Sequence, residues 1–133
     1  MAKILIVEDN ALNIKLFCDL LAAHGHEPKA VTDSRQALDL AREFVPDLVI
    51  TDIQLPHVNG LELIRMLRVD DRLSDVPIMA VTAYSTKGDE ERAREAGAQS
   101  YVSKPISVVK FVQQVDSLLT GQEMPATSAK APA

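Results

Sequence analysis

The sequence has very little of the chemistry that cysteine and histidine provide. Its 133 residues include one cysteine, Cys18, and three scattered histidines. A single cysteine excludes an intramolecular disulfide and any zinc site built from several cysteines, and the histidines do not have a familiar ligand spacing. Because Cys18 lies in an apolar helical stretch, we expect it to fill space in the core.

The sequence also lacks a long apolar run and an excess of basic residues. No run approaches the roughly 20 apolar residues that a membrane helix needs, and the N-terminal MAKILIVEDN reaches two carboxylates too early for a secretory signal. The net charge is −5, whereas nucleic-acid-binding domains normally carry a basic excess. We therefore expect a cytoplasmic protein without membrane insertion and without a direct nucleic-acid partner.

What the sequence does contain is a regular alternation of two kinds of segment. Short apolar segments predict buried strands at residues 3–7, 48–51, 77–81 and 99–102. A weaker segment, HEPKAV, which ends in the apolar residues 30–31, predicts the second strand. The amphipathic stretches between and after them predict helices at residues 11–23, 34–44, 61–69, 87–96 and 108–119. This order predicts an α/β fold, a (βα)5 doubly wound sheet of five parallel strands.

Individual residues mark the ends of these elements. Asn10 and Ser34 are predicted helix N-caps, and Gly25 and Gly97 stand where a helix C-terminus favours a left-handed residue. Pro28 indicates that the second strand lies at an edge of the sheet, because proline cannot donate a ladder hydrogen bond.

The length of the chain is typical of one domain. We assign that domain to residues 1–120. Residues 121–133 are rich in small residues and have no apolar periodicity, so we expect a disordered C-terminal tail.

Five chemically distinctive residues stand at or just beyond the predicted strand ends. Glu8 and Asp9 follow the first strand, Asp52 the third, Thr82 the fourth and Lys104 the fifth. The carboxyl ends of parallel strands meet at one edge of a sheet, so these side chains are expected to converge. Taken singly, each has an ordinary structural explanation, such as a helix cap or a surface lysine. Their joint placement favours a site.

The expected chemistry is metal-assisted phosphoryl transfer. Three neighbouring carboxylates repel one another, and a divalent cation with oxygen ligands, Mg²⁺ rather than zinc, would relieve the repulsion. Asp52 is the best nucleophile, because turn-forming residues after it are expected to keep it exposed. Its attack on phosphorus would form an acyl phosphate, while Thr82 and Lys104 hold other phosphoryl oxygens.

Four segments, LIVEDN, PDLVITDIQLPHVNG, AVTAY and YVSKPIS, resemble the receiver domain of bacterial two-component response regulators. The resemblance covers residues 3–119 and implies the flavodoxin-like or CheY-like receiver fold. It implies that Asp52 is the phosphoacceptor and that Glu8 and Asp9 are the acidic pair that binds Mg²⁺. The backbone carbonyl of Gln54 would complete the coordination of the metal.

The same resemblance assigns roles at the other strand ends. Thr82 corresponds to the switch hydroxyl and Lys104 to the lysine that contacts phosphate, and the bond from Lys104 to Pro105 corresponds to a cis peptide. Glu8 stands where many receivers have aspartate, which should leave Mg²⁺ binding intact but make it more water-mediated.

Within the family, EDNALNIKLFCDLL, KGDEERAREAGA and SYVSKPISVVKF are most similar to single-domain, DivK-type cell-division regulators of alphaproteobacteria. This similarity implies a phosphoryl group received from the phosphohistidine of a sensor histidine kinase and a signal given by phosphorylation-dependent protein binding. The protein would not be an enzyme beyond its own phosphorylation and dephosphorylation. We expect a monomer or a weak dimer.

Two surfaces are expected to serve partners. Helix 87–96 has only alanines to bury, so we expect it to pack weakly and to serve as a switch element. Thr82 would move toward the phosphoryl group and let Tyr101 turn inward. This movement would change the face formed by helix 87–96, the fifth strand and the fifth helix. Leu12 and Ile14 lie near the acidic edge and, with Pro105, are predicted to face the kinase. The residues expected to supply the core stripe of the first helix are Leu16, Phe17, Leu20 and Leu21.

Several alternatives stay open. A phosphorelay intermediate or a chemotaxis-type receiver would use the same site. A metal-dependent phosphohydrolase would need a second aspartate two residues after its nucleophile, where this chain has Gln54, and a flavodoxin-like cofactor binder would need a loop richer in hydroxyls and glycine than EDNALN. An interaction module that is never phosphorylated is the last alternative.

Overall fold

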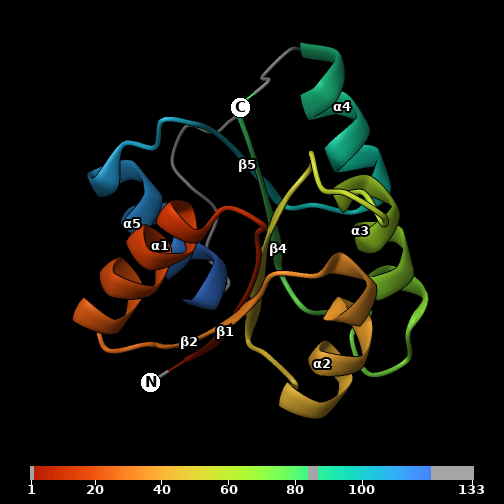
Figure 1. The fold of residues 1–133 in the computed structure, drawn as a ribbon, viewed down its shortest axis with the longest axis horizontal. Helices are drawn as coiled ribbons and strands as arrows, with labels where there is room; N and C mark the ends of the chain where they lie inside the picture. The colour runs from red at the N-terminus through yellow and green to blue at the C-terminus, as the bar shows by residue number, and fades with distance from the viewer. Residues whose placement is uncertain (1, 84–86, 121–133) are drawn as a thin grey trace.

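The computed structural model describes residues 2–83 and 87–120 of the chain (Figure 1). The predicted tail at 121–133 lies outside the described residues. None of the described helices is long and apolar enough to cross a membrane.

The centre of the molecule is a sheet of five parallel strands in the order β2-β1-β3-β4-β5. The strands are β1 (Lys3–Val7), β2 (Glu27–Val31), β3 (Leu48–Asp52), β4 (Ile78–Thr82) and β5 (Ser100–Ser103). The strand order reverses direction after β1, as in a doubly wound fold. The predicted fold class is therefore confirmed, and so is the edge position of β2.

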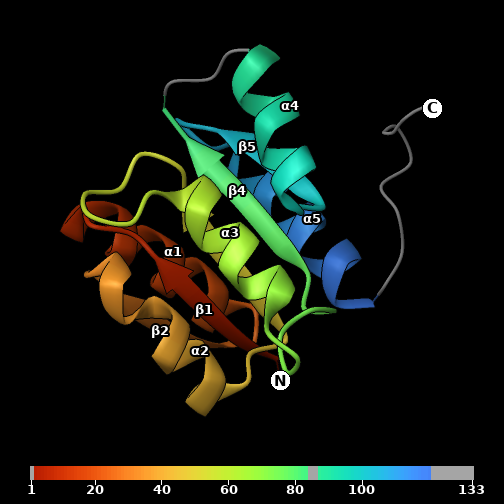
Figure 2. The same cartoon turned by 90° about the vertical axis from the view of Figure 1, so that its right-hand side faces the viewer.

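Helices cover both faces of the sheet, with α1 and α5 on one side and α2, α3 and α4 on the other (Figures 1 and 2). Their bounds are α1 (Ala11–Ala23), α2 (Ala37–Phe44), α3 (Gly60–Val69), α4 (Lys87–Ala96) and α5 (Val108–Thr120). Alternate strand residues face two separate cores, because side chains of a strand point to opposite faces. On the side of α1 and α5, the rings of Phe17 and Phe111 stack with centroids 5.3 Å apart.

The predicted helix ends are mostly confirmed. The side chain of Asn10 accepts a hydrogen bond from Asn13 N, and Gly25 and Gly97 have φ values of 84° and 128°. The prediction for Ser34 is wrong. Asp33 caps a 3₁₀ turn, η1 (Ser34–Gln36), that precedes α2, while Ser34 is buried and its hydroxyl contacts another loop.

β2 covers most of the weaker segment HEPKAV and not only its apolar end at residues 30–31, because it pairs with β1 from Lys3 onward even though much of this edge strand is exposed. One other prediction is wrong. Leu16 was expected in the core stripe of α1, but it is 42% exposed, whereas Phe17 and Leu21 are buried. The core between α1 and α5 is filled without Leu16.

Candidate functional site

Three carboxylates meet at the carboxyl edge of the sheet. Glu8 and Asp9 follow β1 and Asp52 ends β3, two strands that are neighbours in the sheet. One ligand oxygen of each lies within 4.8 Å of the others. Glu8 is 2% and Asp52 7% exposed, while Asp9 is exposed. The expectation that Asp52 would be exposed is therefore wrong, because its two carboxylate oxygens accept hydrogen bonds from the Gln54 N–H and from Lys104 Nζ.

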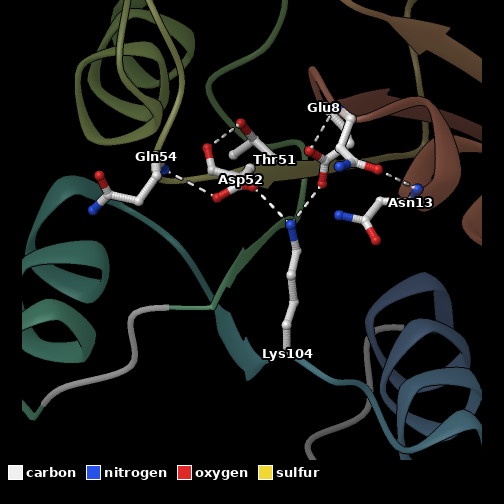
Figure 3. A network of polar contacts seen from close by, with 7 residues as sticks. Glu8, Asn13, Thr51, Asp52, Gln54 and Lys104 are labelled. Carbon is white, nitrogen blue, oxygen red and sulfur yellow. Dashed lines mark hydrogen bonds and ion pairs between the residues drawn. The ribbon is translucent and has the colours of Figure 1, made fainter.

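A lysine from the other half of the sheet completes this cluster. Lys104 Nζ donates to Glu8 Oε1 and to Asp52 Oδ2, each at 2.8 Å (Figure 3). Lys104 follows β5, and its backbone N–H donates to the Thr82 carbonyl at 2.8 Å, which continues the β4–β5 ladder past its last pair. The ammonium group thus joins residues that are 96 and 52 positions away in the sequence.

Burial and charge set the protonation of this cluster. Burial raises the pKa of Glu8, and the charge of Asp52 adds to the increase, while the hydrogen bond from Lys104 opposes it. For Lys104, burial alone would lower the pKa, but the contacts with Asp52 and Glu8 raise it overall. The lysine is therefore held as the ammonium ion.

The donor set fits a divalent cation with a preference for oxygen. At the cluster Glu8, Asp9 and Asp52, three carboxyl groups face a single ammonium group, so a bound cation would reduce the repulsion between them. The cluster contains no nitrogen or sulfur ligand of the kind that zinc prefers. Carboxylates of this kind, with room for water at the exposed Asp9, suit Mg²⁺.

The local backbone fixes the position of Asp52. The Gln54 backbone N–H donates to Asp52 Oδ1 at 3.0 Å, and the Gln54 side chain points away from the cluster (Figure 3). Gly60, the first residue of α3, lies so close to the end of β3 that a Cβ at this position would be 2.1 Å from the Asp52 carbonyl oxygen. Its N–H donates to the Ile53 carbonyl at 2.9 Å, so α3 begins directly against the end of β3.

Thr82 and Tyr101 lie on the two strands beyond Asp52. Val81 is the register partner of Asp52, so Thr82 stands one residue further along β4, fully buried. Tyr101 pairs with Ala80 in the register of β4 and β5 and is half-buried against the core on the α2–α4 side. The structure thus places the two predicted switch residues on β4 and β5, the strands that precede and follow α4 in the chain.

An apolar groove of about 330 Å³ opens beside Lys104. It runs between α1 and the segment that joins β5 to α5. The residues that line it are Asn13, Leu16, Phe17, Ala83, Lys104, Pro105, Ile106 and Val108.

The predicted partner-facing residues are only partly brought together by this groove. Pro105 lines it and follows a cis peptide bond, as the resemblance implied. Leu12 is 79% exposed and Ile14 is half-buried, and neither lines the groove. Leu16 lines the groove but was not predicted to do so, because its spacing along α1 is that of a core residue.

Comparisons with known proteins identify relatives of this chain. The model of the response regulator receiver domain family matches residues 4–116. The polar-differentiation response regulator DivK of Brucella anthropi is 53% identical over 116 residues, which cover 87% of this chain and 94% of that protein.

Solved structures give the same result. The receiver domain of a sensor histidine kinase from Pseudomonas aeruginosa, with a magnesium ion coordinated in its active-site cleft, superposes with a TM-score of 0.83 at 29% identity, covering 90% of this chain and 98% of that one. The chemotaxis protein CheY4 of Vibrio cholerae has the same fold, with a TM-score of 0.84 at 24% identity and coverage of 89% and 98%.

These matches remove the phosphohydrolase and flavodoxin-like alternatives, because they extend over the whole alternating βα region rather than over one motif. The chain belongs to the family of response regulator receiver domains.

Proposed function

We propose that Asp52 accepts a phosphoryl group from the phosphohistidine of a sensor histidine kinase. The observation that carries this proposal is the contact of one ammonium group, Lys104 Nζ, with both Asp52 and Glu8 in a recessed carboxylate cluster. This reaction needs a nucleophilic carboxylate, a cation that can contact a phosphoryl oxygen, and a set of oxygen ligands for a metal.

The transfer is a displacement at phosphorus. A carboxylate oxygen of Asp52 forms the new P–O bond, the P–N bond to the donor imidazole breaks, and its electron pair stays on the imidazole nitrogen. The Gln54 N–H and Lys104 hold the two oxygens of Asp52 in place beforehand, so little reorganisation precedes attack. Hydrolysis of the resulting acyl phosphate would reverse the signal, and we propose no other catalytic activity for the chain.

Mg²⁺ would be held by the carboxylates of Glu8, Asp9 and Asp52 and by the Gln54 carbonyl. When bound, it neutralises charge that builds up on the transferring phosphoryl oxygens. The excess of carboxyl groups over ammonium groups in the cluster and its all-oxygen ligands support this assignment.

The phosphorylated state would be reported through Thr82 and Tyr101. The Thr82 hydroxyl would contact a phosphoryl oxygen, and Tyr101 would move inward, changing the face made by α4, β5 and α5. The packing of α4 supports this proposal, because only two alanines, Ala93 and Ala96, are buried along its length. A downstream protein would bind this face in only one of the two states.

The kinase would dock over the groove beside Lys104, with Leu12, Ile14 and Pro105 at its border. An apolar groove next to the acceptor fits a helical partner that must bring its phosphohistidine to Asp52. The similarity to DivK supports a role in cell-division or polarity control. The protein would act in the cytoplasm, as a monomer or weak dimer. Onward transfer in a phosphorelay would use the same acceptor.

The test is phosphorylation by a small donor. The purified protein is incubated with Mg²⁺ and acetyl phosphate, and its intact mass is measured. We expect a gain of one phosphoryl group that requires Mg²⁺ and disappears in Asp52→Ala, but persists in Asp71→Asn, a change of an exposed aspartate outside the site. No gain with any donor would contradict the proposal and favour a module that is never phosphorylated.

A further inference from the structure

Ser34 connects the start of α2 to the loop that follows the proposed acceptor. It is only 3% exposed, and its hydroxyl donates to the Pro56 carbonyl at 2.7 Å and accepts from the Val58 N–H at 3.1 Å. Both partners are backbone groups of residues 53–59, the segment between β3 and α3. A side chain from one loop thus fixes the backbone of another.

The two bonds join the peptide groups on either side of His57. His57 has a φ of 69°, a left-handed conformation that a non-glycine residue rarely adopts without support. Because Ser34 Oγ contacts both Pro56 O and Val58 N, it holds the chain in this tight turn. Proline at position 56 restricts the backbone further.

Capping of the helix does not account for this serine. The first turn of η1 is already capped by Asp33, whose carboxylate accepts from Arg35 N at 2.9 Å. The Ser34 hydroxyl instead satisfies a carbonyl and an amide of the β3–α3 loop.

The position of this loop bears directly on Asp52. Gln54 lies two residues before Pro56, and its N–H donates to Asp52 Oδ1 at 3.0 Å. At the other end of the loop, the Gly60 N–H donates to the Ile53 carbonyl at 2.9 Å. The loop is therefore fastened at its base by α3 and at its tip by Ser34, with Gln54 between the two attachments.

We propose that Ser34 is a positioning residue for the phosphoacceptor loop, which sets the place of Gln54 relative to Asp52. This inference rests on the proposed function, because it assigns a consequence for metal binding and phosphorylation. Outer contacts of a metal site typically change affinity by about 10–100-fold, and since Ser34 acts through one further residue we expect Ser34→Ala to weaken Mg²⁺ binding roughly 3- to 10-fold. The rate of phosphorylation should fall by a similar factor.

The experiment compares Ser34→Ala with Val115→Ala, which removes volume from the opposite core beneath α5 and serves as a control for lost stability. Three quantities are measured: Mg²⁺ affinity by calorimetry, the rate of phosphorylation by acetyl phosphate, and amide hydrogen exchange in the metal-free protein. We expect faster exchange at Gln54 and Val58 and weaker Mg²⁺ binding in Ser34→Ala only. Ser34→Gly, which also lacks the hydroxyl, should behave in the same way and replaces Ser34→Ala if that variant does not fold.

Unchanged exchange at Val58 and unchanged Mg²⁺ affinity in Ser34→Ala would overturn the positioning role. Equal losses in Val115→Ala would also overturn it, because the effect would then follow general stability. If the unaltered protein binds Mg²⁺ but takes up no phosphoryl group, the proposed function fails, while the exchange and affinity measurements still decide the role of Ser34.

Discussion

Replacing Lys104 by methionine should destabilise the metal-free protein in a pH-dependent way. The ammonium lies 2.8 Å from an oxygen of Glu8 and of Asp52, and all three side chains are at most 15% exposed. At an effective dielectric constant of about 20, each contact is worth roughly 6 kcal/mol before desolvation is subtracted. Burial of the ammonium offsets much of this, yet the pKa of Lys104 is still raised, so the net interaction is favourable.

Removing one partner of a buried ion pair typically costs about 3–5 kcal/mol, and because this site opens to water beside Asp9 we expect about 2–3 kcal/mol at pH 8. For a domain of this size that corresponds to a melting temperature lower by roughly 8–12 °C. The loss of stability in Lys104→Met should be smaller at pH 5. Without the lysine, the already raised pKa of Glu8 rises further, and protonation of Glu8 then relieves the repulsion from Asp52.

Thermal unfolding by circular dichroism in EDTA, at pH 5 and pH 8, measures this effect. Methionine keeps the length of the side chain, and Lys110→Met, at an exposed lysine of α5, is the matched control and should change little. Mg²⁺ should raise the melting temperature of Lys104→Met more than that of the unaltered protein, because it no longer competes with an ammonium for Asp52. An equal decrease at both pH values, with no difference in the Mg²⁺ response, would refute the electrostatic argument and leave only lost packing.

Four further substitutions follow from the structure. Glu8→Gln should raise the melting temperature in EDTA, by an amount that grows as pH rises above 4.5. Burial raises the pKa of Glu8, so its ionisation opposes folding. Calorimetric titration of the same variant should show weaker Mg²⁺ binding. Arg68→Ala removes a guanidinium that donates to three backbone carbonyls, and urea unfolding should show a free energy of unfolding lower by about 2–4 kcal/mol. Arg68→Lys should not restore this stability. Gly60→Ala forces a methyl group against the carbonyl oxygen of Asp52, so we expect a loss of about 2–3 kcal/mol in the same assay and slower phosphorylation. Val45→Asn should stabilise by about 0.5–1 kcal/mol, because Val45 has a φ of 48° that asparagine tolerates better, and an unchanged urea midpoint would contradict this.

The order of the elements could be predicted from the sequence because each local pattern agreed with the final fold. Strand segments such as LVI in β3 are apolar on both faces, as a strand between two helix layers must be. β2 was harder to predict, because an edge strand is half-exposed and its sequence, EPKAV, has no such pattern; its extent is set by pairing with β1. Tertiary contacts decided this boundary.

The convergence of the site residues was predictable, but their contacts were not. Strand ends of a parallel sheet must share an edge, which is enough to bring Asp52 and Glu8 together. Nothing in the sequence shows that Lys104 contacts both, that Asp52 is recessed or that the hydroxyl of Ser34 reaches the β3–α3 loop. These features depend on how loops from different strands pack, and a serine before a helix has the same local signal whether it caps the helix or contacts a distant loop.

The position of Lys104 explains how one covalent change could reach two surfaces. Its ammonium contacts Asp52, its backbone N–H is bonded to Thr82, and its side chain lines the groove next to Pro105. A phosphoryl group on Asp52 adds negative charge where Nζ already lies, so the ammonium would be drawn toward it and away from Glu8. Because the backbone N–H of Lys104 is bonded to the Thr82 carbonyl, we expect this shift to affect the end of β4 as well as the groove proposed for the kinase. Under the proposed function, this one lysine would link acceptance of the phosphoryl group to both proposed partner surfaces.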